Sequence, residues 1–115
     1  IQSWHGKHGT IEGPLVLFPK SPQVVFNVFA IQVTESNGLK REFTLVNFEN
    51  TEVFKKIREK LQSAWDKDPS NTINGRNKLI RPDLRLKATG VFNVVDPGQA
   101  NPQILLKDEK AVTVP

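Results

Sequence analysis

Residues 51–65, TEVFKKIREKLQSAW, have the spacing of an amphipathic helix, and the position of this segment in the chain decides the fold. Its apolar residues recur at the intervals that place side chains on one stripe of a helix: Val53, Phe54, Ile57, Leu61, Ala64 and Trp65. Asn50 or Thr51 can cap the start of the helix, and Pro69 ends it. We expect the rings of Phe54 and Trp65 to pack in the core rather than against a ligand.

Three segments before the helix have the composition of β-strands. Residues 10–18 form the first, and Gly13 and Pro14 within it predict a bulge or an edge position. Residues 23–34, QVVFNVFAIQVT, are β-branched and aromatic on both faces, which is typical of a central strand. A turn of hairpin composition then leads into the third strand, residues 40–48.

A polar connection and two further strands follow the helix. The connection, residues 69–78, is long for so small a domain, and loops of this length are often functional. Residues 84–95 alternate between two faces and predict the fourth strand. A turn at 96–101 leads to the last strand, which we expect as one strand or as two short pieces at 103–106 and 111–114.

The last hairpin carries a resemblance to a known fold family. The run LRLKATG at 84–90 is followed by NPQILLKD at 101–108, and Gly13 interrupts the first strand. These features, together with the order of three strands, one helix and two strands, resemble OB-fold (oligonucleotide/oligosaccharide-binding) nucleic-acid-binding domains. The resemblance covers residues 10–114 as a pattern and identifies no subfamily.

The resemblance implies a mainly β fold. We expect a five-stranded, partly open Greek-key barrel with one helix, at about 51–65, between strands three and four. The chain of 115 residues supports a single hydrophobic core. We therefore expect one OB-fold-like domain over 10–115, preceded by a flexible N-terminal segment over 1–9.

Positive charge is concentrated in one stretch of the chain. There are 16 Lys and Arg against 12 Asp and Glu, so the net charge is +4. Between 76 and 87, Asp83 is the sole acidic residue among five basic ones: Arg76, Lys78, Arg81, Arg85 and Lys87. Such a local excess is typical of phosphate-binding surfaces, although a solvated basic loop without a ligand has the same composition.

Several classes of function are disfavoured by composition. With no cysteine, the chain has no disulfide, no thiolate zinc site and no cysteine nucleophile. His5 and His8 are the two histidines, and two ligands in a terminal segment are weak evidence for a metal site. Neither a P-loop nor a dinucleotide-binding motif occurs, and the longest apolar stretch, around 24–31, is too short to span a bilayer. We expect no catalysis, cofactor, metal or membrane partner, and an intracellular location in the cytoplasm, nucleoid or nucleus.

These observations favour non-catalytic binding of single-stranded nucleic acid, DNA rather than RNA, through a basic surface and stacking aromatic rings. In OB-fold domains the nucleic acid usually crosses the face of strands two and three, and the resemblance implies the same face here. Asn27 interrupts the apolar face that it shares with Phe29, which makes this face the candidate for solvent contact, although a strand Phe is more often a core residue. The candidate contacts are Asn27, Phe29, Lys40, Arg41, Arg76, Lys78, Arg81, Arg85 and Lys87.

Two other functions remain open. The first is an OB-fold protein–protein interaction module within a larger complex that handles DNA or RNA. The second, less favoured because the chain has no Tyr, is an oligosaccharide-binding domain. The salt dependence of affinity distinguishes the protein–protein interaction module from a nucleic-acid-binding domain. Binding of a polyanion releases counterions, so its affinity falls steeply with salt, whereas docking of a protein on an apolar surface depends on salt less.

Overall fold

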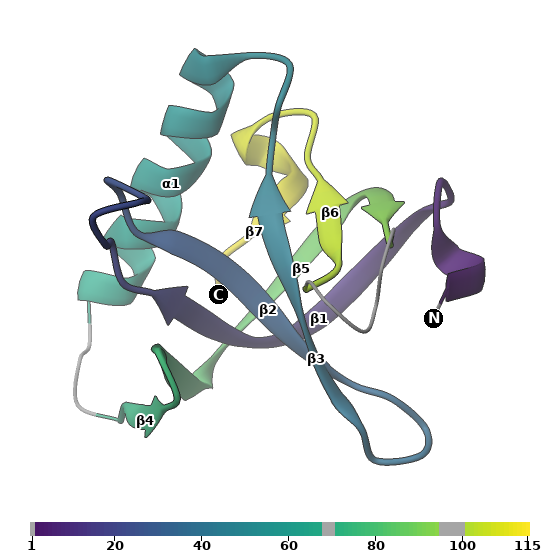
Figure 1. Cartoon of the computed structure of the whole chain (residues 1–115), viewed down its shortest axis with the longest axis horizontal. Helices are drawn as coiled ribbons and strands as arrows, with labels where there is room; N and C mark the ends of the chain where they lie inside the picture. Colours follow the sequence, from purple (N-terminus) through teal and green to yellow (C-terminus); the bar gives the residue numbers. More distant parts are fainter. Residues whose placement is uncertain (1, 68–70, 95–100) are drawn as a thin grey trace.

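The computed structural model describes residues 2–67, 71–94 and 101–115 and is mainly β (Figure 1). A short 3₁₀ helix, η1 (Gln2–Trp4), begins the described chain, and a second, η2 (Glu109–Ala111), lies near its end. The remaining elements are β1 (His8–Phe18), β2 (Val28–Thr34), β3 (Lys40–Val46), α1 (Thr51–Asp66), β4 (Ile73–Gly75), β5 (Lys78–Asn93), β6 (Gln103–Leu105) and β7 (Val112–Thr113).

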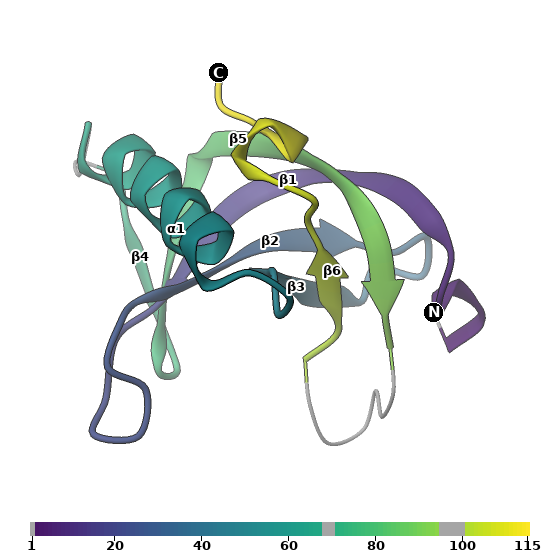
Figure 2. The same cartoon turned by 90° about the horizontal axis from the view of Figure 1, so that it is seen from above.

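The strands follow one another around a ring. β1 pairs with β2, and β2 with β3, in antiparallel orientation. β3 pairs with β6 in parallel, β6 pairs with β5, and β5 returns to pair with β1 along most of its length. The sheet thus closes partly on itself, and β4 and β7 add to it at β5 (Figure 2). The mainly β fold, with its helix after the third strand, is confirmed.

The fourth long strand begins earlier than its sequence pattern indicates. β5 starts at Lys78, and β4 pairs with its first three residues in a hairpin. The prediction of a polar connection over residues 69–78 is therefore wrong for residues 73–78, which form this hairpin. Asp83 and Pro82 look like a strand end in the sequence, yet β5 continues through them. The last strand forms two short pieces, β6 and β7, as one alternative predicted. The expected turn at 96–101 lies outside the described residues except for its last position.

The expected irregularity in the first strand is a change of register. β1 and β5 pair Pro14 with Arg85 but Leu15 with Arg81, so the extra residues of β5 bulge out at this point. Gly13 is required here, because a Cβ on it would lie 1.9 Å from the carbonyl oxygen of Gln32. A close backbone approach of this kind excludes any side chain.

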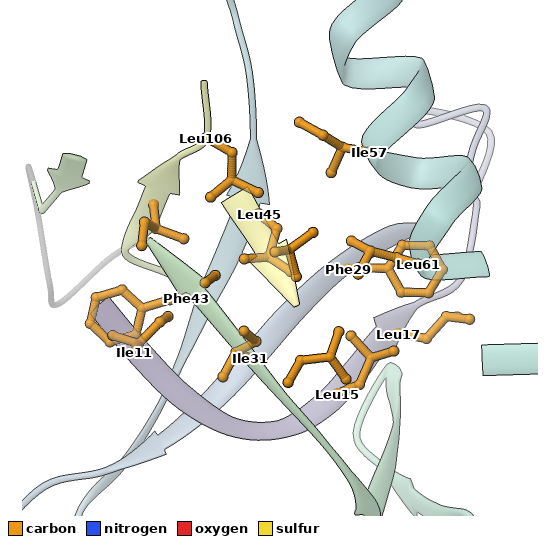
Figure 3. Packing of buried hydrophobic residues seen from close by; sticks show 14 of the residues in the cluster. Ile11, Leu15, Leu17, Phe29, Ile31, Phe43, Leu45, Ile57, Leu61 and Leu106 are labelled. Atoms are coloured by element: carbon orange, nitrogen blue, oxygen red, sulfur yellow. The ribbon is translucent and has the colours of Figure 1, made fainter. Parts of the chain in front are cut away.

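The core fills the inside of the ring and the space beneath the helix (Figure 3). Alternate residues of β1, β2 and β3 point inward, while α1 contributes Ile57, Leu61 and Trp65 from one stripe. Asn50 caps the helix, since its Oδ1 accepts a hydrogen bond of 3.1 Å from the amide of Val53. The predicted burial of Trp65 is confirmed.

Two residues of α1 lie in surroundings that the sequence did not predict. Phe54 is only half-buried, and its ring meets that of Phe26 edge-on at 5.7 Å between centroids, with the guanidinium of Arg58 over both rings. Lys60 lies outside the apolar stripe of the helix, yet it donates from Nζ to the carbonyl oxygens of Glu109 at 2.8 Å and Val112 at 2.6 Å. This lysine therefore ties the C-terminal segment to the helix.

The N-terminal segment packs against the ring, so the expected boundary at residue 10 is wrong. The ring of Trp4 lies 5.1 Å from that of Phe92 and 5.7 Å from that of Phe43. The amide of Gly6 donates to the carbonyl of Phe92, and the amide of Phe92 donates to the carbonyl of Lys7. His5 Nδ1 accepts a hydrogen bond from the amide of Val94 at 3.0 Å. The sequence could not predict this packing, because the partners of Trp4, Phe43 and Phe92, are distant from it along the chain.

We expect Trp4→Ala to lower the free energy of unfolding by about 2 kcal/mol, because a half-buried ring loses two aromatic partners. Urea unfolding followed by circular dichroism measures this change. Ser3→Ala, at the adjacent exposed position, is the control and should stay within about 0.5 kcal/mol of the wild type. Equal stability of the two variants would mean that the segment is not part of the fold.

Candidate nucleic-acid interface

The candidate contacts predicted from the sequence do not form one surface, and two of them are in the interior. Phe29 is 2% exposed, and its ring lies 6.5 Å from that of Trp65. β2 pairs Phe29 with Leu17 of β1, which is also a core residue. The prediction that Phe29 stacks on a ligand is therefore wrong. Both faces of this strand are apolar, so alternation alone could not tell its inward side from its outward side.

Arg81 is 3% exposed and cannot contact a phosphate, which corrects a second prediction. Its guanidinium donates from Nη2 to the carbonyl oxygen of Trp65 and from Nε to Thr72 Oγ1 at 3.2 Å. The guanidinium carbon also lies 4.8 Å from the ring centroid of Trp65. The last carbonyls of a helix lack partners within the helix and carry partial negative charge. Arg81 therefore closes the C-terminal end of α1.

We expect Arg81→Met to lower the free energy of unfolding by about 2 kcal/mol, since the charged hydrogen bonds to Trp65 and Thr72 are lost. Arg85→Met is the matched control on the same strand, because Arg85 is exposed and should change stability by less than about 0.5 kcal/mol. Urea midpoints of both variants provide the test. Similar midpoints for the two variants would contradict the internal role of Arg81.

Asn27 is half-buried, and both ends of its amide are engaged within the fold. Its Oδ1 accepts from the amide of Lys20 at 2.9 Å, and its Nδ2 donates to Gln62 Oε1 at 3.0 Å. Asn27 thus ties the segment between β1 and β2 to α1. Its contact with a ligand stays a prediction.

Three of the remaining candidates belong to what we call the β3 surface, defined by Lys40 and Glu42 of β3 with Arg76 and Lys78 of the β4–β5 hairpin. Lys78 Nζ forms an ion pair with Glu42 across the 36 residues that separate them in sequence. Arg76 is exposed at the turn of the same hairpin. Arg41 takes the alternate strand position, on the side of Phe43, and pairs with Glu35 at 3.2 Å, so it is not part of this surface.

Alternation along β3 separates its core side from its outer side. Phe43 and Leu45 are buried in the core, while Lys40, Glu42 and Thr44 take the alternate positions. The outer side continues onto neighbouring strands by register: Gln32 lies opposite Glu42, and Gln103 opposite Thr44. Asn93 of β5 then follows, with its Nδ2 donating to Gln103 Oε1 at 2.6 Å.

Gln32, Thr44, Asn93 and Gln103 were not identified from the sequence. Each is a polar strand residue of a common type, and none belongs to a motif. The one indication in the sequence was at Thr44, which alternates with the apolar residues Phe43 and Leu45 and so was expected on the outer side of its strand. Together they give the β3 surface a floor of amide and hydroxyl groups, which can both donate and accept hydrogen bonds. Lys78 reaches this side of the ring through its ion pair with Glu42, and the exposed Arg76 and Lys40 are each two residues away from one of these partners along the chain.

Arg85 and Lys87 lie elsewhere on the ring, on what we call the β1–β5 surface. Register places Arg85 opposite Pro14, and Lys87 opposite Glu12. Both cations lie 3.8 Å from oxygens of the Glu12 carboxylate, and all three side chains are more than half exposed. β6 separates β5 from β3 on one side of the ring, and β1 and β2 separate them on the other. The basic stretch of the sequence is therefore divided between two surfaces and the interior.

Within the described residues, no group of three or more His, Cys, Asp or Glu side chains is placed to hold a metal ion. Over the same ranges no helix has the length and apolar character needed to cross a membrane. Comparison with protein-family models, with curated proteins and with solved structures finds no match to this chain.

Proposed function

We propose that this chain is an OB-fold domain that binds single-stranded nucleic acid, without catalysis, on the β3 surface. The observation that carries the proposal is the ion pair between Lys78 and Glu42, which joins the β4–β5 hairpin, with the exposed Arg76 at its turn, to the outer side of β3, where Lys40 also lies. This is the side on which OB-folds bind oligonucleotides.

The strand pairing supports the OB-fold assignment. A ring of five strands, β1, β2, β3, β6 and β5, with a helix after the third strand in sequence, has the element order of that fold. The parallel pairing of β3 with β6 and the return of β5 to β1 are what a partly open Greek-key barrel requires. β1 pairs with β2 at one end and with β5 along most of its length, and Gly13 leaves room for the carbonyl of Gln32 of β2.

The chemistry of the β3 surface supports a polyanionic ligand. Ammonium and guanidinium groups bind phosphates, and the amides of Gln32, Asn93 and Gln103 can bond to base edges of an unpaired strand. Phe29 and Phe43 are buried, so their rings supply no stacking on this surface. We therefore attribute affinity here to charge and hydrogen bonding, which implies little sequence preference and strong salt dependence.

Fluorescence anisotropy with a labelled thirty-base strand tests the proposal, using DNA and RNA in turn and duplex DNA as the control. Contact of Lys40, Arg76 and Lys78 with three phosphates gives a slope of about −2 for log affinity against log salt on a single strand. Tighter binding to the single strand than to the duplex, with such a slope, supports the proposal. Equal affinity for both, or affinity independent of salt, contradicts it and favours a module that docks a protein partner.

A further inference from the structure

An apolar groove lies on the outside of the ring where β5, β6, the start of β1 and the segment after β3 meet. It encloses about 580 Å³ and is lined by His8, Asn47, Phe48, Glu49, Thr89, Gly90, Val91, Leu105, Leu106 and Lys107. None of these residues belongs to the contacts predicted from the sequence. The volume and the largely apolar lining are typical of sites that accept a small molecule or a chemical group of similar size.

The most exposed apolar side chain of the groove is Phe48, which is 65% exposed. Its backbone is held in place by Asn47, whose Nδ2 donates to the carbonyl of Leu106 at 2.8 Å. The Oδ1 of Asn47 accepts from the amides of Glu49 at 3.0 Å and Asn50 at 2.9 Å. An aromatic ring is therefore presented to solvent by a segment fixed on both sides, which favours stacking because little conformational freedom is lost on binding.

The other side chains at the groove suit a nucleotide. The imidazole of His8 is exposed in the same lining and offers a second flat ring. Lys107 is also exposed and can bind a phosphate, while Glu49 is the carboxylate of the lining. An exposed ring beside a cation is the combination by which proteins bind the bases and backbone of single strands.

The groove is continuous with the β3 surface across β6. Gln103 of β6 lies between Thr44 of β3 and Asn93 of β5. Two residues further along β6, Leu105 lies between Val46 and Val91, and Val91 lines the groove. Residues two apart on a strand share one face and are separated by about 7 Å. A strand that crosses the outer side of β3 therefore reaches the groove without leaving this face of the ring.

We propose that this groove binds one unstacked base of the single-stranded nucleic acid, with the base against the ring of Phe48. The inference rests on the proposed function, and it adds a stacking site that the β3 surface itself lacks. Because every base has a flat π-face, the site accepts any base and contributes affinity without sequence specificity.

Substitution of Phe48 tests the stacking site by anisotropy at several salt concentrations. Phe48→Leu keeps an apolar side chain but removes the flat ring, and we expect about tenfold weaker binding of the thirty-base strand with an unchanged salt slope. Phe48→Trp keeps a ring and should bind at least as tightly as the wild type. Val25→Ala, at a position 78% exposed in the segment between β1 and β2, is the control and should leave affinity unchanged.

The outcomes separate this inference from the proposed function. If the wild type binds the single strand and Phe48→Leu binds equally well, the stacking site is wrong and the β3 surface stands. If Phe48→Leu weakens binding but also reduces the salt slope, the ring acts through a charged contact and the stacking site is again wrong. If the wild type binds no single strand, the proposed function fails, and the inference fails with it.

Discussion

Phe29→Ala is expected to lower the free energy of unfolding by about 4 kcal/mol. The ring is 2% exposed and packs with Leu17 and Trp65 in the centre of the core, so its removal combines loss of apolar burial with a cavity. A domain of this size is stabilised by only about 5–15 kcal/mol, so the variant will be close to unfolding at physiological temperature. Urea unfolding followed by circular dichroism measures the change.

Phe48→Ala is the matched control for this prediction. It makes the same chemical change at a ring that is 65% exposed, and we expect the free energy of unfolding to change by less than about 1 kcal/mol. If Phe29→Ala folds as stably as Phe48→Ala and loses nucleic-acid binding, Phe29 is a surface contact and the core described above is wrong.

The second large effect concerns binding. Lys40→Glu combined with Arg76→Glu should weaken binding of a single strand about a hundredfold, since each reversal removes a phosphate contact and adds repulsion. The salt slope should fall from about −2 to about −0.7, because Lys78 is the one cation that keeps its place on the surface. Lys78 is left unchanged because it also pairs with Glu42 in the fold. Anisotropy titrations at several salt concentrations measure both quantities.

Two matched variants carry the same change in net charge at other places. Lys55→Glu with Lys56→Glu alters exposed positions on α1 and should weaken binding less than about threefold. Arg85→Glu with Lys87→Glu alters the β1–β5 surface, where Glu12 already faces both cations. If this last pair weakens binding as much as the β3 pair does, the interface lies on the β1–β5 surface instead.

The order of elements could be read from the sequence because each signal is local. The helix shows its period, its Asn50 cap and its inward-facing Trp65 within one segment. The irregularity at Gly13 and Pro14 was likewise visible, although the reason for it, the approach of the Gln32 carbonyl, was not.

The candidate site was predicted less well because it depends on contacts between distant segments. Arg81 and Arg85 look alike in the sequence, yet the bulge in β5 places Arg81 inside, against the end of α1, and Arg85 outside. Lys78 reaches the β3 surface through a hairpin that the sequence pattern indicated as a loop. Phe48 is 65% exposed, but it lies at the end of a predicted strand, and nothing in the sequence indicated that its ring faces solvent.

The location of the interface is tested most directly by ¹H–¹⁵N NMR spectra of the chain titrated with a short single-stranded DNA. A protein of 12.9 kDa gives resolved amide signals, so each strand reports separately. We expect the largest shift changes at Lys40–Val46 of β3, at the β4–β5 hairpin and at Gln103–Leu105 of β6. Changes confined to α1 or to Glu12, Arg85 and Lys87, or no changes at all, would contradict binding on the β3 surface.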